Sequence, residues 1–275
     1  MNKKILIILI VVVVLGITEL LALTVFKSGK NIATADAECF KVDSEKNEIT
    51  DYKEICGNEL KIPEDIKGVK IKKIGNNAFS KKGLTTVILP KGIEEIGISA
   101  FSDNEIEILD IPETVKTIKP LAFENNKIKK LKIPESVLNI GFKAFNNNQV
   151  SGDDAFIYQR TESGIDNTML IGYAGKKREN IKVPEEVDYL YLYAFADCNI
   201  KSIKLNDKLE RIETGAFENN NLTSIEIPQN VIVVNRNAFA GNNGLKEIKV
   251  KGKKSLSDFS MFNTDELDTA IITFE

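Results

Sequence analysis

Hydrophobic and polar positions along this chain repeat with a period of 22 residues. The clearest copy is Leu84–Phe101, in which Leu-x-x-Val-x-Leu-Pro is followed by Ile-x-x-Ile-Gly-x-x-Ala-Phe. Seven Ala-Phe pairs share this register, and they begin at Ala78, Ala100, Ala122, Ala144, Ala194, Ala216 and Ala238. A fixed period in this range predicts a solenoid, in which each repeat forms one coil that stacks on its neighbours.

One repeat, residues 128–149, indicates how a coil is built. Leu131 and Ile133 alternate with lysines, which is the spacing of a strand with one face turned inward. Pro134 lacks a backbone donor and ends that strand, and Phe145 supplies the largest apolar group of the coil. A run of three asparagines then turns the chain towards the next strand. One coil cannot bury its own apolar face, so the core is expected to form only in the stack.

The period is broken once, because Ala144 and Ala194 are separated by 50 residues, or 22 plus 28. The additional stretch holds two apolar segments on either side of Glu162-Ser163-Gly164, which predicts a β-hairpin that protrudes from one coil or replaces part of it. The expected divisions are 1–30 for a membrane anchor or signal segment, 31–59 for an N-terminal cap, 60–250 for the repeats with the hairpin at about 151–177, and 251–275 for a C-terminal cap.

The repeat resembles that of the leucine-rich repeat proteins of the BspA-like subclass. The resemblance rests on Leu-x-x-Ile-x-Ile-Pro, Val-x-x-Ile-Gly and Ala-Phe-x-x-Asn/Cys, as in Leu222–Asn242, where Asn235 replaces the glycine. It covers about residues 60–250 and implies a β-rich leucine-rich repeat stack with short helical or 3-10 turns. It also implies a bacterial surface or secreted binding protein, without indicating a ligand.

The N-terminal segment predicts export. Residues 5–26 are largely apolar, interrupted by Glu19, and follow two lysines; their length of 22 residues is close to that of a membrane-spanning helix. One interpretation is an uncleaved single-pass anchor with the repeats outside the cell. The other is a signal peptide cleaved within Ala33–Ala37, which would give a secreted protein. Residues 16–21 also resemble a prepilin signal faintly.

The three cysteines are expected to differ in role. Cys39 and Cys56 lie on either side of a turn at Ser44–Glu48, and an extracellular location permits a disulfide between them. The alternative is a pair of unrelated reduced thiols. Cys198 occupies the position held by asparagine in other repeats, so we expect a buried structural thiol there.

Composition excludes several kinds of site. The chain has no histidine, which excludes Ser-His and Cys-His nucleophile pairs as well as histidine metal sites. A formal net charge of −3 does not favour nucleic-acid binding. With no phosphate-binding loop or catalytic carboxylate pair visible, we expect neither enzymatic activity nor a cofactor.

Two groups of residues are candidates for ligand contact. The first is a set of lysines at polar positions of the main strands, Lys129, Lys130, Lys132, Lys182, Lys201 and Lys204, which could meet an acidic polymer or a negative protein surface. The second is Tyr158 and Tyr173 in the insertion, because tyrosine adds contact area at low entropic cost. The alternatives are a solvated polar face for the lysines and packing of the hairpin for the tyrosines.

The sequence therefore predicts an extracellular leucine-rich repeat module that binds protein or surface glycan, as in adhesion. The alternative is a passive spacer or a subunit of a cell-surface or pilus-like assembly.

Overall fold

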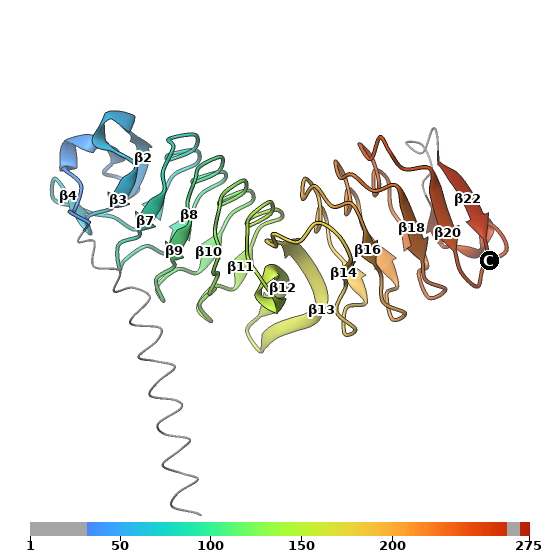
Figure 1. Ribbon diagram of the computed structural model, residues 1–275. Helices are drawn as coiled ribbons and strands as arrows, with labels where there is room; N and C mark the ends of the chain where they lie inside the picture. Colours follow the sequence, from blue (N-terminus) through green and yellow to red (C-terminus); the bar gives the residue numbers. More distant parts are fainter. Residues whose placement is uncertain (1–31, 263–269) are drawn as a thin grey trace, which may run out of the picture. The chain divides into compact units, whose positions relative to one another are not determined.

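The computed structural model describes residues 32–262 and 270–275. Thr34–Glu275 forms one compact unit, a stack of coils in which strands line two faces and the described helical elements are all short 3-10 turns (Figure 1). These turns are η1 (Ala37–Cys39), η2 (Glu54–Cys56), η3 (Asp153–Ala155) and η4 (Leu256–Asp258). The unit encloses its own continuous apolar core, so it is expected to fold without the residues before it. The predicted solenoid with one hairpin insertion is confirmed.

The first face holds the first strand of each coil, which a proline follows in most of these coils. They are β3 (Glu59–Lys61), β7 (Thr86–Ile88), β9 (Ile108–Asp110), β14 (Ile181–Lys182), β16 (Ile203–Lys204), β18 (Ser224–Ile227), β20 (Glu247–Val250) and β22 (Ile271–Phe274). They pair in parallel as β3-β7-β9, β14-β16 and β18-β20-β22. Equivalent residues of neighbouring repeats lie opposite each other, as Val87 does with Leu109, so the sequence period sets the register directly.

The second face holds the strands that precede the Ala-Phe turn. They are β2 (Glu48–Tyr52), β6 (Lys73–Ile74), β8 (Glu95–Ile96), β10 (Thr117–Ile118), β11 (Asn139–Ile140), β15 (Tyr189–Leu190), β17 (Arg211–Ile212), β19 (Val233–Val234) and β21 (Met261–Phe262). Between β11 and β15 lie the two strands of the insertion, β12 (Phe156–Thr161) and β13 (Gly164–Tyr173). The first coil carries a small antiparallel pair of its own, β4 (Asp65–Ile66) with β5 (Val69–Lys70).

A column of phenylalanine rings runs through the core. The ring of Phe123 lies 5.2 Å from Phe101 and 5.4 Å from Phe145 between centroids, nearly parallel to both. Phe217 stacks in the same way on Phe195 and Phe239. These rings are fully buried, as expected for the largest apolar group of each repeat.

A second buried column is made of asparagine amides. The Nδ2 group of Asn126 donates to the carbonyl oxygens of Phe101, Phe123 and Glu124 at 2.9–3.2 Å, and its Oδ1 accepts from the N–H of Ile106. One side chain therefore satisfies buried backbone groups of two coils, which would otherwise destabilise the turn. The equivalent asparagines are Asn104, Asn148, Asn220 and Asn242.

Cys198 takes the asparagine position in its coil, as predicted. Its Sγ lies 3.2 Å from the carbonyl oxygen of Ala196 and 3.5 Å from that of Tyr173. The thiol is fully buried, and burial raises its pKa to about 12. Both observations indicate a structural thiol and oppose a nucleophilic role.

The N-terminal end of the stack is closed by a disulfide-linked hairpin. β1 (Phe40–Asp43) pairs antiparallel with β2, and Cys39 is bonded to Cys56, which confirms the predicted disulfide. The rings of Phe40 and Tyr52 both pack against Phe79, the first ring of the phenylalanine column. This arrangement covers the open end of the core.

Residues 5–26, expected to form an anchor or a signal segment, lie outside the residues that the structure describes. Within the described ranges, 32–262 and 270–275, none of the helices has the length and hydrophobicity needed to cross a membrane.

Candidate binding site at the interrupted coil

The insertion places an antiparallel hairpin between coils whose strands pair in parallel. β12 and β13 pair antiparallel, and Met169 and Leu170 of β13 then pair in parallel with Tyr189 and Leu190 of β15. Gly172 and Tyr173 lie 22 residues, or one period, before Ala194 and Phe195. The end of β13 therefore takes the place of the Ala-Phe pair in its coil, with Gly-Tyr in place of Ala-Phe.

Tyr173 is therefore a core residue, and its proposed role in ligand contact is wrong. Its ring lies 5.4 Å from that of Phe195 and 5.3 Å from that of Phe156, and only 2% of the residue is exposed. Burial raises the pKa of its hydroxyl to about 12, and that hydroxyl donates to the carbonyl oxygen of Lys177. Tyr173 is buried because it lies one period before Phe195, and not because it is a tyrosine.

On the first face, the chain departs from the repeat and leaves a hollow. Val150 begins a coil normally and pairs with Gly175, but the backbone then turns at Gly152, which has a φ of 75°, into η3 and the hairpin. No strand forms in residues 128–133. The open hollow beside them has a volume of about 630 Å³ and is lined by Lys129, Lys130, Leu131, Lys132, Gln149, Ser151, Asp154 and Lys176.

A second hollow of about 350 Å³ adjoins the first and shares Leu131, Lys132 and Asp154 with it. Its remaining lining is Ile133, Asp153, Phe156, Ile157, Tyr158, Arg160 and Ile165. We call the two together the junction hollow. Its wall is fixed by Arg160, whose guanidinium donates to the carbonyl oxygens of Pro134 at 2.7 Å and Ile133 at 3.1 Å.

The junction hollow carries a net positive charge, because its lining holds Asp153 and Asp154 against Lys129, Lys130, Lys132, Lys176 and Arg160. Several lysines pair with glutamates one period away: Lys129, at the hollow itself, with Glu107 at 2.7 Å, and Lys201 with Glu179 at 2.9 Å. In the described part of the chain, the side chains of Lys130, Lys132 and Lys176 have no such ion pair, and they line the hollow together. Exposed, unpaired ammonium groups beside a concave surface attract anions.

The candidate lysines thus fall into three groups. Lys130 and Lys132 line the hollow free of ion pairs, and Lys129 lines it while bound to Glu107. Lys201 is engaged with Glu179. The last group comprises Lys182 on β14 and Lys204 on β16, which lie opposite each other beyond the insertion and do not line the hollow.

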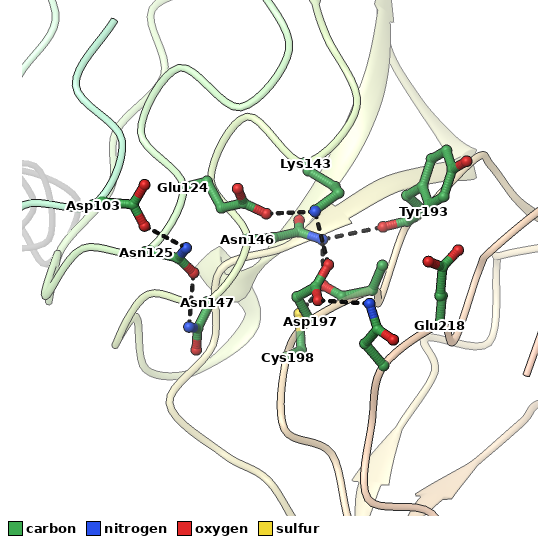
Figure 2. A network of polar contacts seen from close by, with 12 residues as sticks. Asp103, Glu124, Asn125, Lys143, Asn146, Asn147, Tyr193, Asp197, Cys198 and Glu218 are labelled. Carbon is green, nitrogen blue, oxygen red and sulfur yellow. Dashed lines mark hydrogen bonds and ion pairs between the residues drawn. The ribbon is translucent and has the colours of Figure 1, made fainter. Parts of the chain in front are cut away.

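At the edge formed by the Ala-Phe turns, a polar network joins the coils on either side of the insertion (Figure 2). The Nζ of Lys143 lies 2.7 Å from Oε1 of Glu124 and 2.7 Å from Oδ2 of Asp197. The Nδ2 of Asn146 donates to the carbonyl oxygen of Tyr193 at 3.1 Å. Burial raises the pKa of Glu124; burial also opposes the charge on Lys143, but hydrogen bonds to Asp197 and Glu124 leave its pKa raised.

The charged groups of this network pair with one another, and within the described residues Oε1 of Glu124 is buried with no partner besides its ion pair with Lys143, so the network acts as a joint between coils. Among residues 32–262 and 270–275, no group of three or more acidic or thiol side chains is arranged to hold a metal ion. The contribution of Lys143 was not evident from the sequence. One signal existed: Lys143 occupies the turn position held by Asn77 and Asn237, where the backbone φ is positive and a small polar residue is usual.

Sequence reasoning also missed Lys176 and Arg160, which line the junction hollow from the insertion. Neither belongs to a repeat position on the main strands, where the candidates were sought. Their only sequence signal was basic charge within the segment that interrupts the period.

Comparison with known proteins agrees with this geometry. The family model described as the BspA type leucine rich repeat region matches residues 52–152 and 172–275 with six copies. The unmatched residues between the two stretches contain most of the hairpin. No match was found among the curated proteins.

Solved structures show the same fold at low identity. A leucine-rich repeat protein from Eubacterium ventriosum is 21% identical with a TM-score of 0.54, over 71% of this chain and 54% of that protein. The pneumococcal vaccine antigen PcpA is 22% identical with a TM-score of 0.51, over 79% of this chain and 68% of its own. A leucine rich cell surface protein from Faecalibacterium prausnitzii is 19% identical with a TM-score of 0.50, over 90% and 96%. The chain spans about half the length of the Eubacterium protein.

Proposed function

Because the chain belongs to the BspA-type leucine-rich repeat family, we propose that it is a cell-surface module that binds a protein or a surface glycan through the junction hollow. The family and its fold are generally non-enzymatic, and a regular stack offers a broad surface for recognition instead. The observation that carries the proposal is the group of unpaired lysines, Lys130, Lys132 and Lys176, around a hollow at the one place where the repeat is interrupted.

The proposed binding surface is smaller than the whole strand face. A spacer would need ion pairs between coils, such as Glu107 with Lys129, but no group of basic side chains around one hollow. The charge left unpaired at the hollow contributes little to folding, since exposed charges add little stability. Binding explains this charge better than a passive role does.

Binding is tested with residues 34–275 on an array of matrix proteins, serum proteins and acidic polysaccharides. The variant Lys130→Glu/Lys132→Glu/Lys176→Glu should lose its ligands, while the control variant Lys182→Glu/Lys204→Glu, which reverses two exposed charges outside the hollow, should keep them. Both variants alter exposed lysines of the first face, so a general charge effect would weaken both. Equal loss from both variants, or no ligand for the unmodified protein, would remove the hollow as the binding surface.

We further propose that residues 5–26 anchor the protein with the repeats outside the cell, since this apolar stretch approaches the length of a spanning helix. The disulfide between Cys39 and Cys56 fits an oxidising compartment. Protease added to whole cells should reach the repeats, and the full chain should fractionate with membranes. Repeats cleaved only after lysis would contradict the outside placement, and recovery from the medium would indicate a secreted protein.

A further inference from the structure

We propose that the junction hollow takes an extended acidic segment of a partner protein, in which carboxylate side chains alternate with aliphatic or aromatic ones. This inference rests on the proposed function and deepens it, because it selects polypeptide over glycan. It is carried by the charge of the hollow, the apolar surface inside it, and the order of residues along its lining.

The basic part of the lining fits carboxylates. Lys130 and Lys132 are exposed on either side of the buried Leu131, and both line the same hollow. Lys176 approaches the same hollow from the insertion. Side chains that alternate along an extended peptide return to one face about every 7 Å, so one face of such a peptide can present successive carboxylates to the lysines of the hollow.

The apolar part of the lining fits hydrophobic side chains. Ile133, Phe156 and Tyr158 are only partly buried, although they pack against the core. They line the adjoining hollow together with Lys132, so apolar surface and positive charge meet in one concave region. A polyanionic glycan would use the lysines and leave this surface in water, whereas a peptide with aliphatic or aromatic side chains covers it.

The acidic residues of the lining determine which side of the ligand faces which part of the hollow. Asp153 lines only the hollow that holds Phe156 and Tyr158, whereas Asp154 lines both hollows. A second run of carboxylates there would be repelled. The acidic residues of the partner therefore lie along Lys130 and Lys176, and its apolar residues lie against the hairpin.

The inference is tested by fluorescence anisotropy with residues 34–275 and synthetic probes. The main probe is a peptide of about eight residues, long enough at about 3.3 Å per residue to cross the hollow, in which Glu alternates with Leu and Tyr. Three reference probes separate the contributions: the same peptide with Lys for Glu, a polyglutamate of equal length, and heparin. Each is measured at about 0.1 M and about 1 M salt, where the Debye length falls from about 10 Å to about 3 Å.

We expect the acidic and apolar peptide to bind at least about tenfold more tightly than polyglutamate and heparin, and the Lys peptide not to bind. Lys130→Glu/Lys132→Glu should weaken the main probe by about tenfold or more, and Lys182→Glu/Lys204→Glu should leave it unchanged. Tyr158→Ala should weaken the main probe but not polyglutamate. Thermal unfolding of each variant verifies that its fold is retained.

Other outcomes overturn the inference in distinguishable ways. Equal or tighter binding of heparin would show that charge alone is recognised, which rejects the peptide but leaves the proposed function intact. Binding that both lysine variants reduce equally would reject the hollow, and the proposed function with it. If none of the acidic probes binds while the array ligands still depend on Lys130, Lys132 and Lys176, the peptide assignment alone fails.

Discussion

Lys143 reaches across the insertion to Asp197, with 2.7 Å between Nζ and Oδ2, and so connects the turns of the coils that precede and follow the hairpin (Figure 2). The same ammonium group lies 2.7 Å from Oε1 of Glu124, in its own half of the stack. The side chains of Lys143 and Glu124 are only 16% and 10% exposed, so solvent screens this contact weakly. The irregular coil is thus held in place by charge as well as by packing.

The first prediction concerns this joint. Lys143→Met should lower the free energy of unfolding by about 2 kcal/mol, because it leaves two carboxylates close together with one of them buried. The loss is expected to stay below the roughly 3–5 kcal/mol of a fully buried pair, since Asp197 is partly exposed. Urea unfolding measures the difference. The matched change Lys129→Met breaks an exposed ion pair of the same length and should have little effect on the free energy of unfolding. Equal losses from the two variants would contradict a stabilising role for Lys143 at the joint.

The second prediction concerns pH. Burial raises the pKa of Glu124 above its ordinary value of 4.5, so the folded protein retains a proton there that the unfolded chain has released. The free energy of unfolding should therefore fall as pH rises from about 4.5 through the raised value. Glu124→Gln cannot ionise and should lack this fall. Urea unfolding of both proteins between about pH 4 and pH 8 should show the stability of the variant increasing relative to that of the unmodified protein as pH rises. A difference in free energy of unfolding that does not change with pH would contradict a raised pKa at Glu124.

The third prediction concerns the phenylalanine column. Phe145→Ala should lower the free energy of unfolding by about 3–5 kcal/mol, as for other large core truncations that leave a cavity. Phe142, three positions earlier, is half-buried and contacts Tyr193 at 5.4 Å between ring centroids, so Phe142→Ala should cost clearly less. Chemical denaturation compares the two. A loss below about 1 kcal/mol for Phe145→Ala would exclude a core role.

The fourth prediction concerns the cysteines. Alkylation of the denatured, unreduced protein should label a single thiol, because Cys39 is bonded to Cys56 and Cys198 is free. The folded protein should not react, since Cys198 is buried and its pKa is raised to about 12. Mass spectrometry counts the labels, and Cys198→Ala provides an unlabelled control. Labelling of all three cysteines would contradict the disulfide. A disulfide that closes a loop of this size is expected to stabilise the fold by about 3 kcal/mol.

Most of the stack could be predicted from the sequence, because each coil contacts only its neighbours and repeats their pattern. The apolar period predicted that Phe123 and Phe217 contact the phenylalanines of neighbouring coils and that Cys198 takes the position of Asn126, and the structure agrees. The pairing of Cys39 with Cys56 could be inferred from a local pattern, since the two cysteines flank a pair of short strands joined by a turn.

The insertion could be located from the sequence, but only the tertiary structure decided what it does. The position of Tyr173 depends on the parallel pairing of β13 with β15, which returns the chain to the repeat after a hairpin that has no period of its own. The meeting of Lys132, Lys176 and Tyr158 around one hollow, and of Lys143 with Asp197, depends on how far the hairpin separates the coils. The repeat period and local propensity determine the contacts within the stack. Contacts across the insertion depend on how that unrepeated segment folds back onto the stack, which no repeated pattern in the sequence specifies.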